Sequence, residues 1–317
     1  MKFIRLSAAA LVLVAAAHAA EAPRATYDET TGDVTITEAG KTVLVYHYKN
    51  VPVPAELSSA QKPNKYAVAR SNYIHPLCGL DGMPLTSDWN QDHPHHRGVY
   101  WAWPEVGYKG EIGDLHALQR VWARPTGKLE TRSGDGWVEI EAENRWMWED
   151  KTPIVHETAV IRTWQAGAQG RWIDLTLRFG ALEAGVTLAR RGTKLYGGMN
   201  VRMAKIDHQQ LLHHSDPENA SPRGAWQLAA GRWPGSAAPM SLTVFEKVTN
   251  SGYPADYVQY PDVSWFQPAF PHAQTRHTLE KTQPLTLRYR FWICGGNAPD
   301  EKDLREQWNT YQKSESK

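Results

Sequence analysis

Leu285-Thr286-Leu287-Arg288-Tyr289-Arg290-Phe291-Trp292-Ile293 is the stretch of this sequence that decides the fold. Every second residue from Leu285 to Ile293 is apolar, and Thr286, Arg288, Arg290 and Trp292 lie between them. Because successive side chains of a strand point to opposite faces, this alternation predicts a β-strand. We expect one of its faces to pack in a core and the other to be partly exposed to water.

The same alternation recurs along the chain, with turn residues between the runs. It predicts antiparallel strands: a hairpin of 34–37 with 42–46, and further strands at 136–142, 156–164, 172–179 and 241–248. Two segments rich in Pro, Gly, Ser and His, residues 51–72 and 207–235, are predicted to be long loops.

A helical pattern is clear near the C-terminus, where Leu304, Trp308 and Tyr311 share one face behind an acidic start at Asp300. No break in composition and no internal repeat divides the chain. We therefore expect a mostly β fold, a single antiparallel β-sandwich domain over residues 20–317 that ends in this helix.

The N-terminus has the three parts of a signal peptide. Lys2 and Arg5 precede an apolar run at 8–17, and Ala17-His18-Ala19 is a small-x-small cleavage site. The run is about half of the roughly 20 residues that a membrane-spanning helix needs, and no later segment approaches that length. We expect residues 1–19 to be removed, and the mature protein to be periplasmic or extracellular with no membrane span.

Charge and cysteine content narrow the function further. The 35 basic and 34 acidic residues give a net charge of +1 and are mixed along the chain, so no nucleic-acid partner is expected. Cys78 and Cys294 are the only cysteines. Two alternatives stand for them: a disulfide, which export would permit, or two buried thiols.

The densest polar cluster is Asp92-His93-Pro94-His95-His96-Arg97-Gly98, directly before the aromatic run Tyr100-Trp101-Ala102-Trp103. Pro94 favours an extended backbone at His93, and in an extended chain His93, His95 and Arg97 share one side, with His96 on the other. Neutral imidazoles at this spacing suit a general base or a metal ligand. A divalent metal ion is therefore one cofactor to consider, although surface His tracts also bind metals adventitiously.

Two acidic residues on predicted strands are further candidates. Glu157 lies in 156–164, and Asp174 lies on the face of 172–179 that is opposite its aliphatic residues. If that face lines a cleft, both are candidate acids or bases. If it faces solvent, they belong to a row of hydrated charges.

Fourteen tryptophans and thirteen tyrosines offer flat faces on which sugar rings stack, although large β cores also use many aromatic residues. The sequence contains no phosphate-binding Gly-rich loop, no Gly-x-Ser-x-Gly, no His-Glu-x-x-His and no Cys-x-x-Cys. These absences argue against the commonest nucleotide-binding, serine-hydrolase, zincin and thioredoxin classes.

Several motifs resemble those of the PmoA-like family of secreted bacterial proteins. They are Asn72-Tyr73-Ile74-His75-Pro76-Leu77, Gly82-Met83-Pro84-Leu85-Thr86, the run 92–98, and later matches at 171–174, 196–199, 202–203, 224–226 and 253–254. The sequence departs from the family at Trp265-Phe266-Gln267-Pro268, where an Asn-Pro-Phe type of motif is usual. The family label refers to a methane monooxygenase subunit, but that subunit spans the membrane several times, so its activity is not carried over.

The resemblance implies a β-sandwich of the galactose-mutarotase supersandwich kind and a role in carbohydrate chemistry. We expect a secreted or periplasmic carbohydrate-active enzyme of hydrolase, lyase or epimerase type that acts on a sugar or glycoside. The alternatives are a non-catalytic carbohydrate-binding protein and a metal-dependent oxidase or oxygenase. The candidate catalytic residues are His93, His95, His96, Glu157 and Asp174, and the candidate substrate-binding residues are His75, Arg97, Arg202, Trp101 and Trp103.

Overall fold

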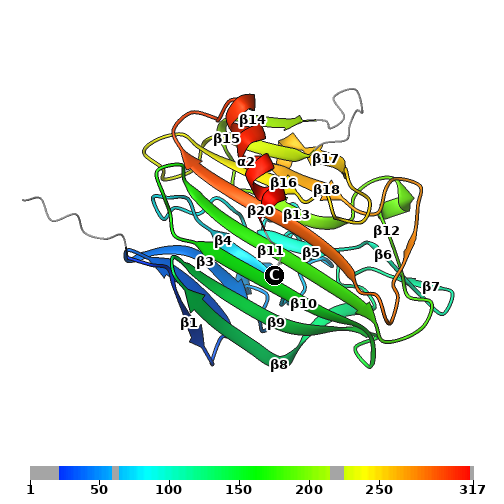
Figure 1. The fold of residues 1–317 in the computed structure, drawn as a ribbon. Coiled ribbons are helices and arrows are strands. Elements are labelled where there is room, and N and C mark those ends of the chain that lie inside the picture. The colour runs from blue at the N-terminus through cyan, green and yellow to red at the C-terminus, as the bar shows by residue number, and fades with distance from the viewer. Residues whose placement is uncertain (1–20, 59–63, 215–224, 315–317) are drawn as a thin grey trace, which may run out of the picture.

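The computed structural model describes residues 21–58, 64–214 and 225–314, and the predicted signal peptide lies outside them. The fold is mostly β, as predicted, with three antiparallel sheets and one helix of several turns at the C-terminus (Figure 1). Within the described residues, no helix is long and apolar enough to cross a membrane.

Two eight-stranded sheets form the sandwich. The strands of the first sheet, in spatial order, are β1 (Arg24–Asp28), β2 (Asp33–Glu38), β3 (Lys41–His47), β4 (Tyr73–Leu77), β5 (Val99–Ala102), β13 (Gly198–Arg202), β18 (Trp265–Ala269) and β17 (Asp256–Tyr260). Those of the second sheet are β14 (Asp207–His214), β15 (Trp226–Arg232), β16 (Met240–Glu246), β20 (Leu285–Gly295), β11 (Arg171–Ala181), β10 (Thr152–Trp164), β9 (Trp137–Trp148) and β8 (Val121–Gly134).

A small third sheet lies at one end of the molecule (Figure 1). It contains β19 (His277–Thr278), β12 (Thr187–Ala189), β6 (Glu105–Tyr108) and β7 (Glu111–Gly113). Short helical turns are found at α1 (Ala55–Ser58), η1 (Arg191–Thr193) and η2 (Pro261–Val263).

The sheets enclose one large apolar core. On β20, the five alternating residues from Leu285 to Ile293 are at most 6% exposed, which confirms the predicted buried face. Its other face is covered in part by helix α2 (Glu301–Lys313), because Trp292 packs in a second cluster with Leu304 and Tyr311. Asp300 caps this helix by accepting a hydrogen bond from the amide of Asp303.

The prediction of a long loop over residues 207–235 is wrong, because β14 and β15 form an antiparallel pair there. Strand β14 lies at the edge of its sheet and is largely exposed, so its sequence shows no buried alternate face. Strand β15 is buried over its first five residues and so lacks alternation as well. Residues 51–72 do form an irregular connection, apart from α1, where the structure describes them.

The two cysteines are both buried and both free. Burial raises the pKa of the Cys78 thiol to about 11 and that of Cys294 to about 12. Of the two alternatives, the structure therefore shows the buried thiols.

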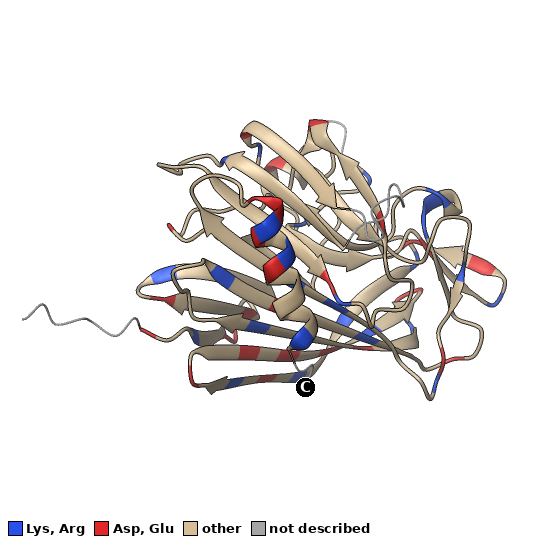
Figure 2. Cartoon of the chain, turned by 45° about the horizontal axis from the view of Figure 1, so that its top comes forward, with Lys and Arg blue, Asp and Glu red and all other residues tan. Residues whose placement is uncertain are grey.

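Acidic and basic residues are interspersed along helix α2 (Figure 2).

The outer face of the first sheet positions the candidate site. Strands β5, β13 and β18 lie side by side, and Val99, Val201 and Phe266 point into the core from adjacent positions. Their sequence neighbours Tyr100 on β5, Arg202 on β13 and Trp265 on β18 point the other way. The segments that lead into these three strands lie over that outer face.

Candidate functional site

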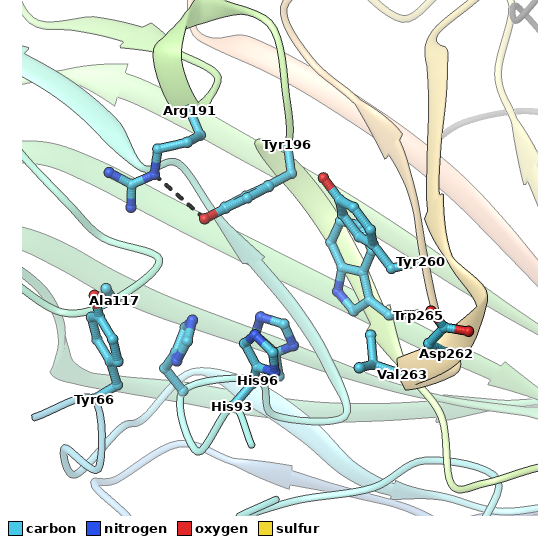
Figure 3. Close-up of a pocket in the computed structure, with 11 residues that line it drawn as sticks. Tyr66, His93, His96, Ala117, Arg191, Tyr196, Tyr260, Asp262, Val263 and Trp265 are labelled. Carbon is cyan, nitrogen blue, oxygen red and sulfur yellow. Dashed lines mark hydrogen bonds between the residues drawn. The ribbon is translucent and has the colours of Figure 1, made fainter. Parts of the chain in front are cut away.

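A pocket of about 470 Å³ opens on the outer face of the first sheet (Figure 3). This volume lies within the usual range for small-molecule sites. The lining residues come from five places: the connection before β4, the segment before β5, the turn between β7 and β8, the region of η1, and the end of β17 with η2 and β18. They are Tyr66, His93, His95, His96, Ala117, Arg191, Tyr196, Tyr260, Asp262, Val263 and Trp265.

The histidine segment is a turn and not an extended strand. The amide of His96 donates to the carbonyl oxygen of His93 at 3.0 Å, and the two rings stack with centroids 4.7 Å apart. The predicted alternation, with His93 and His95 on one side and His96 on the other, is therefore wrong. All three histidines line the same pocket, because Pro94 lies inside a turn that folds His96 back over His93.

His116, from the turn after β7, completes a group of three histidines that we call the histidine cluster: His95, His96 and His116. Each of them offers one ring nitrogen, and these three nitrogens all lie within 4.8 Å of one another. The Nε2 atom of His116 lies 3.0 Å from the hydroxyl of Tyr100 on β5. Sequence reasoning missed His116, because it stands alone in Asp114-Leu115-His116-Ala117 with no motif around it.

The histidine cluster is buried, and burial is the main reason why its members are neutral. It lowers the pKa of His95 to about 3, with a further contribution from the charge of Arg70. The pKa values of His96 and His116 also lie well below the ordinary value, because both are buried and the other histidines are close. At neutral pH the cluster therefore supplies unprotonated imidazoles, suited to accept a hydrogen bond or to bind a metal ion.

His93 differs from the cluster because it is the most exposed of the pocket histidines. Its Nδ1 atom donates to the Oδ2 atom of Asp92 at 3.0 Å, and both side chains are more than 40% exposed. Asp92 also accepts two hydrogen bonds from Nη2 of Arg202. Although partial burial opposes the shift, the bonds from His93 and Arg202 lower the pKa of Asp92 to about 2. A charged carboxylate thus orients the imidazole of His93, leaving Nε2 to accept a proton.

Arg202 lies next to the site, although it is not itself a lining residue. It comes from the outer face of β13, opposite Trp265 of β18. Its Nη1 atom lies 3.5 Å from Nδ1 of His96, at the limit of a hydrogen bond. Arg202 thus links Asp92 to the histidine cluster.

Aromatic rings form the opposite wall of the pocket (Figure 3). Trp265 lies within 6.2 Å, centroid to centroid, of the rings of Tyr196 and Tyr260. Tyr260 is 39% exposed and presents its ring to the opening, whereas Trp265 is buried behind it. Arg191 bonds to both Tyr196 and Asp114 at this wall. Apart from the histidines, sequence reasoning assigned none of these lining residues to the site.

The other four predicted substrate-binding residues do not line the pocket either. Arg97 is fully buried, donates to Asp88 and to the carbonyl oxygen of Val68, and lies over the ring of Trp89. The ring of His75, on β4, bonds to the hydroxyl of Thr86 in the segment between β4 and the histidine turn. Trp101 and Trp103 are buried, and their indole nitrogens donate to Glu157 and to the carbonyl oxygen of Phe270. All four side chains hold the scaffold together, and none presents a free face to the pocket.

Glu157 and Asp174 are also remote from the pocket. Glu157 on β10 is fully buried between the sheets, where it accepts hydrogen bonds from Asn72, Trp101 and Trp146. Burial raises its pKa, although these three donors oppose the shift. Asp174 lies on the outer face of the second sheet in a two-bond ion pair with Arg290. The predicted residues therefore do not converge on one site.

Solved structures with a related β architecture share little sequence with this chain. It is 10% identical to the GH36 α-galactosidase AgaB from Geobacillus stearothermophilus, with a TM-score of 0.43, over 86% of this chain and 41% of that one. Galactose 1-epimerase from Lactobacillus acidophilus NCFM is 8% identical, with a TM-score of 0.42, over 87% of this chain and 100% of that one. A putative kojibiose phosphorylase from human microbiome is 9% identical, with a TM-score of 0.36, over 91% of this chain and 30% of that one. This chain thus spans less than half of two of these three proteins, and likenesses this weak say nothing about activity.

Sequence comparison identifies the family of this chain but assigns no activity to it. No curated protein sequence matches this chain significantly. A model of one family matches residues 33–309, which is nearly the whole of the sandwich and its C-terminal helix. The PmoA-like label stays a prediction. The chain belongs to the family of unknown function DUF6807.

Proposed function

We propose that this protein is a carbohydrate-active enzyme that binds a sugar or glycoside in the histidine pocket and acts on it by proton transfer. The observation that carries the proposal is the composition of the pocket, where polar imidazoles face aromatic rings across about 470 Å³. Sugars combine apolar ring faces with hydroxyl groups, and a site for them needs both kinds of partner.

His93 is the residue best placed to transfer a proton. It lines the pocket, it is partly exposed, and Asp92 fixes its Nδ1 atom so that Nε2 is available to the substrate. His95 and His96 suit this role less well. With a pKa as low as about 3, His95 is a weak base and is not an imidazolium acid at neutral pH. The cluster is better suited to bind substrate oxygens or a metal ion.

The carboxylates argue against the usual chemistry of glycoside hydrolases. That mechanism uses two carboxyl groups on either side of the scissile bond. Among the described lining residues Asp262 is the one carboxylate, while Glu157 and Asp174 lie elsewhere. The arrangement therefore favours elimination, epimerisation or metal-assisted hydrolysis over a paired-carboxylate hydrolase.

The second candidate function is a carbohydrate-binding protein without catalysis. It is favoured by the same absence of a carboxylate pair in the described pocket, since hydroxyl binding needs no acid or base. The two functions separate in one experiment. Purified protein is screened against a panel of glycans, uronates and aryl glycosides, with both binding and product formation recorded.

Turnover that is lost in His93→Gln supports the enzyme. Binding that produces no turnover, and that His93→Gln weakens only modestly, supports the binding protein. If the protein neither binds nor converts any compound in the panel, this counts against a carbohydrate function of either kind.

We further propose that the protein is exported. The tripartite sequence of residues 1–19 supports this, with cleavage after Ala19. Intact-mass spectrometry of protein from the periplasm or medium is expected to give a chain that begins at Ala20 or Glu21. An exported chain that retains Met1 would contradict cleavage.

A further inference from the structure

The three imidazoles of the histidine cluster converge beneath the pocket from two separate segments. Their ring centroids are 4.6 Å apart for His95 and His96, and 5.3 Å apart between each of these and His116. All three side chains are at most 8% exposed. Several polar side chains would not normally be buried so close together without a partner that makes use of them.

The nitrogens of the cluster are not all used within the protein. Nδ1 of His95 and Nδ1 of His116 are buried, and neither has a hydrogen-bond partner among the described residues. The opposite nitrogen of His116, Nε2, is held by the hydroxyl of Tyr100. Histidines that bind metals show this pattern, with one nitrogen fixed by an outer partner and the other left for the ion.

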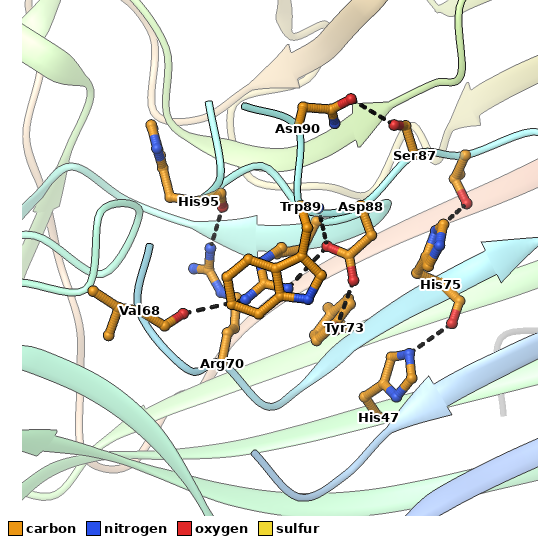
Figure 4. A network of polar contacts seen from close by, with 12 residues as sticks. His47, Val68, Arg70, Tyr73, His75, Ser87, Asp88, Trp89, Asn90 and His95 are labelled. Atoms are coloured by element: carbon orange, nitrogen blue, oxygen red, sulfur yellow. Dashed lines mark hydrogen bonds and ion pairs between the residues drawn. The ribbon is translucent and has the colours of Figure 1, made fainter. Parts of the chain in front are cut away.

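The surroundings hold the cluster in place. Arg70 donates to the carbonyl oxygen of His95 (Figure 4). It also donates to the carbonyl oxygen of His116 and so fixes the two backbones relative to each other. The donors are therefore brought together by the fold before any ion binds.

Two of the neighbouring cations are paired with carboxylates, and the third, Arg70, donates to three backbone carbonyl oxygens. Arg202, which lies beside His96, forms an ion pair with Asp92. Arg191 at the pocket wall forms one with Asp114. The two carboxylates offset the charge of these guanidinium groups near the cluster.

We propose that His95, His96 and His116 bind one divalent transition-metal ion, with a remaining coordination position open to the pocket. Three imidazoles and an open position are the ligand set of catalytic zinc sites, and imidazole is a poor ligand for Ca²⁺ or Mg²⁺. Zinc–nitrogen bonds of 2.0–2.1 Å at tetrahedral angles place the nitrogens roughly 3.4 Å apart. Rings whose nitrogens lie within 4.8 Å reach that spacing by shifts of about 1 Å.

This inference deepens the proposed function, because the open position would take a water molecule or a sugar oxygen. It rests on the proposed function only for that fourth ligand. Binding of the metal by itself does not depend on any sugar.

The test uses full-length mature protein without a His-tag, stripped with a chelator and then loaded with Zn²⁺. Zinc content is measured by mass spectrometry, and affinity by competition with a chromogenic chelator. Wild type is expected to retain one zinc per chain. His116→Gln and His95→Gln are expected to lose affinity by more than the roughly 10–100-fold that removal of an outer partner costs.

Two further variants keep the test independent of folding. Tyr100→Phe leaves all three ligands but removes the outer partner of His116, and we expect zinc to bind about 10–100-fold more weakly. His156→Gln is the matched control, because His156 lies on β10 with 40% of its side chain exposed and pairs with Glu143. Its zinc affinity should equal that of wild type.

Wild-type protein that binds zinc no more tightly than His116→Gln overturns the inference, and so does a Tyr100→Phe variant with unchanged affinity. Sugar turnover by stripped protein that shows no zinc affinity overturns the metal site and leaves the proposed function standing. Stoichiometric zinc binding by the cluster without any activity on sugars supports the metal site and counts against the proposed function.

Discussion

Arg70 donates a hydrogen bond from Nη1 to the carbonyl oxygen of His95 at 2.9 Å, although 25 residues separate them in the chain. The same guanidinium reaches the carbonyl oxygens of Leu115 and His116. Burial lowers the pKa of Arg70 to about 10, so the group is still charged at neutral pH. One buried cation thus joins the two segments that carry the histidine cluster.

Replacing Arg70 with Met is expected to reduce the free energy of unfolding by about 3 kcal/mol, because three buried carbonyl oxygens lose a charged donor. Ligand binding in the pocket should weaken as well, since the two segments separate. Urea denaturation measures the first effect. Arg132→Met, at a side chain that is 52% exposed, is the control and should change stability by less than about 0.5 kcal/mol. An Arg70→Met protein as stable as that control would show that Arg70 does not hold the site.

His93→Gln is expected to lower kcat/KM by about 10²–10⁴-fold, the usual contribution of a general acid or base. The melting temperature should change little, because the side chain is 44% exposed and bonds only to Asp92 among the contacts described. Asp92→Asn should lower kcat as well, since the imidazole of His93 loses the carboxylate that orients it. Full activity in His93→Gln would remove this residue from the chemistry.

Stability is expected to fall as the pH decreases from about 6.5, the ordinary pKa of an unfolded histidine, towards about 3, the pKa of His95 in the fold. In this window the unfolded chain binds protons that the buried cluster does not, so unfolding is favoured by acid. Each such histidine contributes up to about 1.4 kcal/mol per pH unit. Urea denaturation at pH 7, 6 and 5 measures the slope. The slope should be smaller in His95→Gln, and an unchanged slope would mean that His95 is not buried in a neutral form.

Much of the fold could be predicted from the sequence, because a strand with one buried face has a clear pattern. The alternation of β20 identified both its position and its buried face. The pattern failed for β14 and β15, where an edge strand is exposed and its neighbour is almost wholly buried. Neither of these situations produces alternation.

The candidate site was less predictable. The three histidines of the 93–96 segment are evident in the sequence because they lie close together in it. The extended backbone expected around Pro94 is wrong, because the chain turns there. His116 and Tyr260 were missed because each is an isolated residue brought in by tertiary contacts. Trp101 and Trp103 were expected to bind substrate but are buried. An aromatic residue in a β core and one that faces a ligand look the same in the sequence.

Glu157 is expected to be a structural residue. Glu157→Ala would leave the side-chain donors of Asn72, Trp101 and Trp146 unpaired in the core, and each such group costs about 1–3 kcal/mol. The melting temperature should therefore fall strongly. Glu157→Gln should be milder, and the fraction that folds should keep its kcat. A Glu157→Gln protein that folds fully but has lost turnover would return this residue to the list of catalytic candidates.

The most direct test of the central claim, that a sugar binds in the histidine pocket, is a calorimetric titration with the best ligand from the panel, comparing Tyr260→Ala with wild type. Tyr260 lines the pocket with 39% of its surface exposed, and removing its ring should weaken binding about tenfold. Tyr27→Ala, which removes a tyrosine that is 42% exposed on β1, is the matched control and should bind like wild type. Equal affinities in Tyr260→Ala and Tyr27→Ala would place the sugar outside this pocket and contradict the account.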